Sequence, residues 1–142
     1  MKYLLCFLLG MIGLTKLYAV NPEDLTGLWK TYDLNDKPRS IVRFYPIGDS
    51  YQADVIKILD PRDDKCVKCP GDKKNKPYIG MTIIEGLKFQ NNEWRNGTVL
   101  DTDSGKIYQC KITLSEDAKQ MYFRAYMKLP LLGRTVHWKR VD

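Results

Sequence analysis

Hydrophobic and polar residues alternate in short runs along most of the chain. From residue 27 onward, runs rich in β-branched and aromatic residues are separated by clusters of Asn, Asp, Gly and Pro, which is typical of strands joined by tight turns. The runs are 27–33, 40–45, 51–59, 80–89, 93–100, 106–114, 120–127 and 134–141. No run has the apolar spacing of a long helix, so we predict an all-β domain with one short helical turn near Pro22.

The order of these runs predicts how the strands are arranged. Consecutive strands with mostly short connections favour an eight-stranded, antiparallel, up-and-down barrel, because closure removes exposed strand edges. Alternation assigns side chains to the two faces of each strand. In the run 120–127, Met121 and Phe123 lie on one face, and Tyr122 and Arg124 lie on the other. A barrel of this size is either filled by its own side chains or holds one small ligand, and the sequence leaves both open.

The first 19 residues have the features of an export signal. Lys2 precedes an apolar stretch, 3–14, and Ala19 supplies the small residue at which a signal peptidase cleaves. Lys16 interrupts the stretch before the roughly 20 apolar residues that a membrane span needs. We therefore expect an exported protein, periplasmic or secreted, whose residues 20–142 form one domain.

The charge balance restricts the partners. Without residues 1–19 the chain keeps 21 basic and 17 acidic residues, so the net charge falls from +6 to +4. Nucleic acid is not expected for an exported chain without a dense basic face interleaved with aromatic residues. A weak attraction to an anionic membrane surface is compatible with this charge. The sequence does not indicate the number of subunits.

Three cysteines remain after residue 19. Cys66 and Cys69 form a C-x-x-C motif, but a proline and a glycine follow it directly, which disfavours the helix that a redox pair requires. A Cys3His zinc site with Cys110 and His137 is also disfavoured, because those two residues lie within strands. We predict a structural Cys66–Cys69 disulfide, with Cys69–Cys110 as the competing pairing, and neither metal nor cofactor.

One acidic residue falls within an apolar run. Ile83, Glu85 and Leu87 occupy every second position of the run, so we expect Glu85 to share one buried strand face with the two apolar residues. A buried carboxylate needs a partner, for which Arg43 and Arg124 are the candidates.

Two further features resemble a known superfamily. Gly27 and Trp29 open the first strand, and Arg140, with Lys139 beside it, lies in the last. This resembles the glycine-x-tryptophan motif and closing arginine of lipocalins and the wider calycin superfamily. The resemblance implies that Trp29 and Arg140 form a barrel-closing pair, in which the cation covers the indole.

A longer resemblance extends over almost all of residues 20–142. The segments "ILDPRDDKCVKCPGDKKNKPYIGMTII" and "LLGRTVHWKRV" resemble an exported bacterial family catalogued as a domain of unknown function, family 2147, which is regarded as lipocalin-like. The resemblance implies a fold and a compartment. That family has no established activity, so the resemblance implies no catalytic residues.

The function that these features favour is binding. One histidine and no G-x-S-x-G motif give no basis for nucleophilic catalysis, so we do not expect an enzyme. We expect a small hydrophobic or amphipathic ligand in the barrel interior. The predicted wall residues are Trp29, Phe44, Ile83, Phe123 and Trp138, with Tyr126 or Arg124 as a polar contact at the mouth. The alternative is a filled barrel that acts through its outer face or its basic 60–77 loop.

Overall fold

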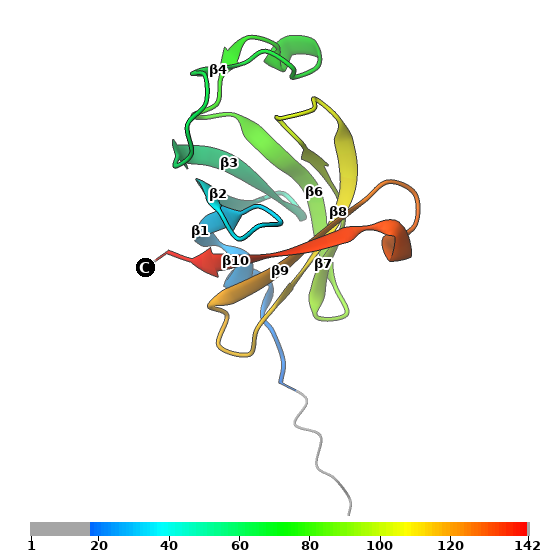
Figure 1. Ribbon diagram of the computed structural model, residues 1–142. Coiled ribbons are helices and arrows are strands. Elements are labelled where there is room, and N and C mark those ends of the chain that lie inside the picture. Colours follow the sequence, from blue (N-terminus) through cyan, green and yellow to red (C-terminus); the bar gives the residue numbers. More distant parts are fainter. Residues whose placement is uncertain (1–17, 142) are drawn as a thin grey trace, which may run out of the picture.

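The computed structural model describes residues 18–141, which form a closed antiparallel barrel (Figure 1). Around the barrel the strands follow the order β1-β10-β9-β8-β7-β6-β3-β2. Their bounds are Gly27–Tyr32 (β1), Pro38–Ile47 (β2), Ser50–Ile58 (β3), Thr82–Gln90 (β6), Glu93–Leu100 (β7), Ile107–Leu114 (β8), Gln120–Tyr126 (β9) and Arg134–Arg140 (β10). This order confirms the predicted eight-stranded barrel. The prediction was possible because strand alternation and turn residues are local features of the sequence.

Three single 3-10 turns and a small sheet complete the structure. The turns are η1 (Pro22–Leu25), η2 (Gly71–Lys73) and η3 (Pro130–Leu132), and β4 (Lys65–Cys66) pairs with β5 (Lys76–Pro77). The predicted helical turn corresponds to η1. None of the helices in the described residues is long and apolar enough to cross a bilayer. The predicted export signal, 1–19, lies outside the described residues except for Tyr18 and Ala19.

The antiparallel order gives the barrel two different ends. One end, called here the closed end, carries η1 and the β2–β3, β6–β7 and β8–β9 turns. The other, called the open end, carries the β1–β2 turn, the 59–81 segment, the β7–β8 turn and the 127–133 loop. Figure 1 shows the 59–81 segment above the barrel and the β6–β7 and β8–β9 turns below it.

Inward-facing side chains fill the closed half. The fully buried ones include Trp29, Val42, Phe44, Ile84, Leu87, Trp94, Ile112 and Met121. They form one continuous apolar cluster with Leu25 of η1 beneath them. Cys110 lies in the same cluster, and burial raises the pKa of its thiol to about 12.

A bulge in β6 overturns the prediction for Glu85. Gly86 has a φ of +73°, and the register with β3 shifts there, so that Ile84 and Leu87 both point into the barrel. Glu85 consequently faces outward, with 55% of its side chain exposed, and its carboxylate lies 3.7 Å from Lys73 Nζ. The predicted buried acid paired with arginine is wrong, because alternation does not continue through an inserted residue.

Candidate functional site

A hollow of about 810 Å³ occupies the open end of the barrel. Inward-facing positions of β8, β9 and β10 form its walls, and the β1–β2 turn, the β7–β8 turn and the 127–133 loop surround its rim. The apolar and aromatic lining residues are Leu34, Val99, Tyr108, Phe123, Ala125, Tyr126, Met127, Leu132, Val136 and Trp138. The barrel is therefore packed in its closed half and hollow in its open half.

Two stacked aromatic rings form the floor of this hollow. The rings of Phe123 and Trp138 lie 4.3 Å apart at an interplanar angle of 8°. Trp138 Nε1 donates a hydrogen bond of 3.3 Å to the carbonyl oxygen of Tyr32, which uses the only polar atom of the indole. The floor thus presents an apolar surface to the hollow.

Charged residues at the rim hold the surrounding turns in place. Arg39 donates to Asp103 at 2.6 Å and lies 3.1 Å from Asp60, which ties β2 to two of the open-end segments. Asp33 accepts hydrogen bonds from the backbone N–H groups of Lys37 and Asn35, and the bond from Lys37 is the main reason that the pKa of Asp33 is lowered. These carboxylates stabilise turns.

The rim also exposes large apolar side chains. Leu34 in the β1–β2 turn is 55% exposed, and Met127 and Leu132 in the 127–133 loop are 61% and 75% exposed. Arg134, where β10 begins, places an exposed cation beside them. An apolar lining with a few polar groups at its edge is the usual composition of a small-molecule site.

Three of the seven predicted ligand residues come together at this hollow, namely Phe123, Tyr126 and Trp138. Trp29 and Phe44 lie fully buried in the closed half.

The other two predicted ligand residues lie outside the hollow. Ile83 faces the underside of the 59–81 segment, where it lines a separate hollow with Leu100 and Ile107. Arg124 lies on β9 and donates to Thr135 Oγ1 of β10 at 2.9 Å.

Sequence reasoning missed several residues of the hollow. Met127 ends the predicted run 120–127 but lies just beyond β9, and we did not include it among the ligand residues. Leu34 and Leu132 sit in connections between strands, where the strand pattern gives no assignment to a face. Their apolar character in otherwise polar turns is the signal that could have identified them.

At the closed end, Trp29 and Arg140 are directly opposite each other on β1 and β10. The guanidinium carbon of Arg140 lies 4.3 Å from the centre of the Trp29 ring, and Trp29 Nε1 donates to the carbonyl of Leu25 at 2.9 Å. Arg140 also donates to the backbone carbonyls of Ala118 (2.8 Å), Thr26 (3.0 Å) and Asp24. The cation therefore connects η1, the β8–β9 turn and the buried indole.

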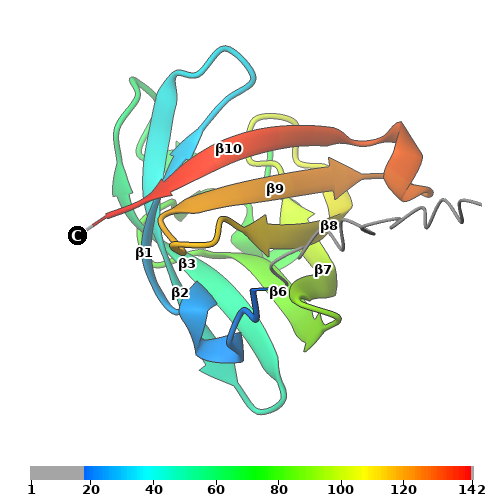
Figure 2. The ribbon, with the colours of Figure 1, turned by 90° about the horizontal axis from the view of Figure 1, so that it is seen from below.

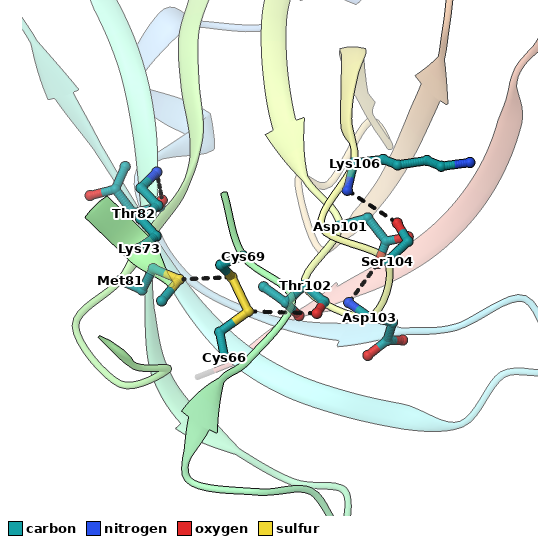
Figure 3. Close-up of a disulfide and its surroundings, with 10 residues drawn as sticks. All are labelled: Cys66, Cys69, Lys73, Met81, Thr82, Asp101, Thr102, Asp103, Ser104 and Lys106. Carbon is teal, nitrogen blue, oxygen red and sulfur yellow. Dashed lines mark hydrogen bonds between the residues drawn. A yellow bond between two sulfur atoms is a disulfide. The ribbon is translucent and has the colours of Figure 1, made fainter. Parts of the chain in front are cut away.

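The predicted Cys66–Cys69 disulfide is confirmed, with a Cα–Cα distance of 5.4 Å (Figure 3). The competing pairing with Cys110 is wrong, because Cys110 is a free thiol buried inside the barrel. Cys66 Sγ lies 3.6 Å from the carbonyl oxygen of Thr102, and Cys69 Sγ lies 3.9 Å from Met81 Sδ. The bridge therefore faces inward, against the β7–β8 turn.

The segment 59–81 has a small core of its own. Both half-cystines are buried with Tyr78, Met81 and Leu100. Gly105 allows the close approach to the β7–β8 turn, since a Cβ there would lie 1.9 Å from the carbonyl oxygen of Lys68. The sequence did not predict the β4–β5 sheet. It also did not predict this packing, because the packing depends on contacts with Leu100 and with the β7–β8 turn.

The residues considered for a zinc site do not converge. Cys66 and Cys69 are bonded to each other, Cys110 is inside the barrel, and His137 is on the outer face of β10. Residues 18–141 contain no group of three or more His, Cys, Asp or Glu side chains placed to hold a metal ion.

Comparisons with known proteins agree with this architecture. The chain is similar to a solved structure described as protein HP1028 from the human pathogen Helicobacter pylori, which belongs to the lipocalin family. The two share 22% sequence identity with a TM-score of 0.72, over 83% of each chain, and this similarity shows a lipocalin-like fold. A search of curated proteins found no match. A family model described as "uncharacterized protein conserved in bacteria (DUF2147)" matches residues 27–140, and the chain therefore belongs to this family.

Proposed function

We propose that this protein is an exported, non-catalytic binding protein that holds one small, mainly apolar or amphipathic ligand at the open end of its barrel. The observation that carries the proposal is the hollow above the stacked rings of Phe123 and Trp138. Its volume of about 810 Å³ falls within the roughly 300–1,000 Å³ typical of small-molecule sites.

The polar groups of the rim favour a ligand with an apolar body and a polar end. The walls of the hollow offer aromatic and aliphatic surface, and the charges lie around the edge. Arg134 is exposed there and suits an acidic or strongly polar group, whereas the apolar part of the ligand would contact the floor. The carboxylates of Asp33 and Asp103 are engaged with backbone N–H groups and Arg39, which supports binding over acid–base catalysis.

The cysteine chemistry supports export. A disulfide persists in oxidising compartments and is rare in the reducing cytosol. The Cys66–Cys69 bridge therefore agrees with the export signal predicted for residues 1–19.

Native mass spectrometry of protein purified from its own exported fraction tests the proposal directly. We expect an adduct that is lost on denaturation and whose mass identifies the ligand. The denatured mass should lack two hydrogens, as the disulfide requires. A clean apo mass without any thermal shift from a panel of lipids and metabolites would contradict the proposal, because a ligand that binds the folded state raises its stability.

A matched pair of variants locates the site. The fluorescent amphiphile anilinonaphthalene sulfonate serves as the probe. Val136→Trp places a bulky ring in the hollow and should weaken probe binding about tenfold or more, which corresponds to ~1.4 kcal/mol. Ile83→Ala alters the separate hollow under the 59–81 segment and should leave binding unchanged. Unchanged binding in Val136→Trp would exclude the open-end hollow as the site.

A further inference from the structure

Charge is distributed unevenly around the barrel. Three adjacent strands, β7, β6 and β3, each carry one acidic and one basic residue: Glu93 and Arg95, Glu85 and Lys88, Asp54 and Lys57. The other five strands, which are also adjacent in the order β8-β9-β10-β1-β2, carry no acidic residue. Their basic residues are Lys30, Arg39, Arg43, Lys111, Arg124, Arg134, Lys139 and Arg140. Arg39 is paired with two aspartates, Arg134 lines the hollow and Arg140 covers Trp29. The remaining charged side chains of these five strands, which form one side of the barrel, are all basic.

Within this side, like charges stand opposite each other on neighbouring strands. Lys30 of β1 pairs with Lys139 of β10, and Lys111 of β8 pairs with Arg124 of β9. Directly opposed like charges destabilise a sheet, so barrel stability does not explain them. None of the ion pairs formed among residues 18–141 includes any of these three lysines. We call the outward side chains of β8, β9, β10 and β1 the basic face.

Aromatic side chains are interspersed among these cations. The Nζ atoms of Lys30 and Lys139 lie 5.7 Å and 5.4 Å from the centre of the Tyr32 ring. Tyr122 and His137 make an edge-to-face contact at 4.8 Å on the adjoining strands. Rings of this kind, with an apolar body and a polar tip, suit the boundary between water and an apolar phase.

The 127–133 loop, which joins β9 to β10, exposes a cluster of leucines. In the 127–133 loop, Leu129, Leu131 and Leu132 are 59%, 90% and 75% exposed, and exposed cations flank them at Lys128 and Arg134. Figure 2 shows η3 at the outer end of the β9–β10 hairpin, away from the other connections. Neighbouring exposed leucines of this kind mark a site of contact with an apolar partner.

We propose that the basic face and the 127–133 loop together dock this protein onto an anionic phospholipid bilayer. Lysines of the basic face lie against lipid phosphates, and Leu129 and Leu131 enter the interfacial region of the bilayer. A soluble polyanion would complement the cations but would leave the leucines exposed to water, and the bilayer satisfies both features. Because Leu132 and Met127 also line the hollow, docking brings the rim of the hollow to the lipid surface.

Vesicle flotation tests this inference with protein purified from the expressing cells, its N-terminus determined by mass spectrometry. One set of vesicles contains phosphatidylcholine alone, and in the other phosphatidylglycerol replaces part of it. We expect binding to the anionic vesicles that weakens as sodium chloride is added, since salt screens exposed charges. Equal binding to both sets, or no binding to either, would overturn the inference.

Two pairs of double variants separate the contributions. Lys111→Gln with Lys139→Gln should weaken binding about fivefold for each lysine removed, whereas Lys57→Gln with Lys88→Gln removes the same charge from the mixed strands and should have less effect. Leu129→Ser with Leu131→Ser should weaken binding about tenfold, and Ile47→Ser with Ile79→Ser should not. All eight positions lie outside the residues that line the open-end hollow, so loss of docking is distinguishable from loss of ligand binding.

The pattern of losses decides between partners. Equal losses in the two lysine pairs would show that net charge alone is responsible, and would overturn the assignment to the basic face. Full vesicle binding by the leucine variant, together with competition by heparin, would indicate a soluble polyanion as the partner and would overturn the bilayer assignment. Thermal unfolding of each variant, matched to the unaltered protein, establishes that the fold is intact.

Discussion

At the closed end of the barrel Trp29 is sealed between η1 and Arg140, whereas at the open end Trp138 forms the floor of a hollow. The two indoles sit on adjacent strands and are both buried. Trp29 is covered by a cation that reaches three backbone carbonyls, but Trp138 contacts one stacked ring and faces a space of about 810 Å³. Similar side chains therefore have different roles, because one end is packed and the other is not.

This difference shows where the stability of the molecule resides. A packed end loses contacts whenever a side chain is shortened, whereas a hollow end tolerates change because part of each side chain already lacks neighbours. We expect substitutions at the closed end to alter the free energy of unfolding, and substitutions at the open end to alter binding.

The largest expected effect comes from truncating the two tryptophans. Trp29→Ala should lower the free energy of unfolding by ~3–5 kcal/mol, because the closed end cannot collapse around the space left behind. Trp138→Ala should cost only about 2 kcal/mol, since its ring already borders a hollow. Urea denaturation followed by circular dichroism measures both. A Trp29→Ala loss below about 1 kcal/mol would contradict the role of this indole in closing the barrel.

The next effect separates two arginines of β10. Arg140→Gln removes the cation over Trp29 and the bonds to backbone carbonyls, and we expect a loss of about 2 kcal/mol. Arg134→Gln changes an exposed residue at the open end and should shift stability by no more than about 0.5 kcal/mol. Denaturation under identical conditions gives the comparison. Equal losses would show that the closed end does not depend on the arginine.

A smaller and more local effect is expected in the 59–81 segment. Replacing Cys66 and Cys69 together by serine opens a short ring, which contributes about 2 kcal/mol or less through loop closure. The barrel should remain folded, and amide hydrogen exchange should accelerate in residues 65–78 but not in the strands. Global unfolding of this variant would show that the segment supports the barrel as a whole.

The effect that is smallest at neutral pH, because it appears only in alkali, concerns Cys110, which lies between the two ends. Burial raises the pKa of its thiol from 9.0 to about 12, so the folded state holds this proton more tightly than the unfolded state. The associated stability is fully present below pH 9 and is lost as the pH rises toward 12. The free energy of unfolding should therefore fall more steeply over this range in the unaltered protein than in Cys110→Ala. Identical slopes would contradict burial of the thiol.

The strands and their order could be predicted from the sequence, whereas positions along the barrel axis could not be read from alternation alone. Alternation correctly places Phe44, Phe123 and Trp138 on the inner face, but it does not say how far each lies from either end. Distance from the nearest turn supplies that information: Trp29 lies two residues after β1 begins at the closed end, and Phe123 lies near the middle of β9. For this reason Trp29 and Phe44 are buried in the core but lie outside the hollow.

Non-local contacts account for the remaining differences. The bulge at Gly86 reverses the facing of Ile83 and Glu85, and it depends on the pairing of β6 with β3. The packing of the Cys66–Cys69 ring depends on Gly105, which lies far from it in sequence. Neither contact leaves a periodic pattern, because each involves a single pair of segments that meet only in the folded chain.

The contact between Trp29 and Arg140 also has a consequence for how the chain folds. These residues belong to the first and last strands of the barrel, and the bonds from Arg140 to Thr26 and Asp24 join residues separated by 114 and 116 positions. Closing so long a loop is entropically costly and kinetically slow. The seal at the closed end cannot form until the last strand is available, because β10 is the strand that pairs with both β1 and β9 and so closes the barrel.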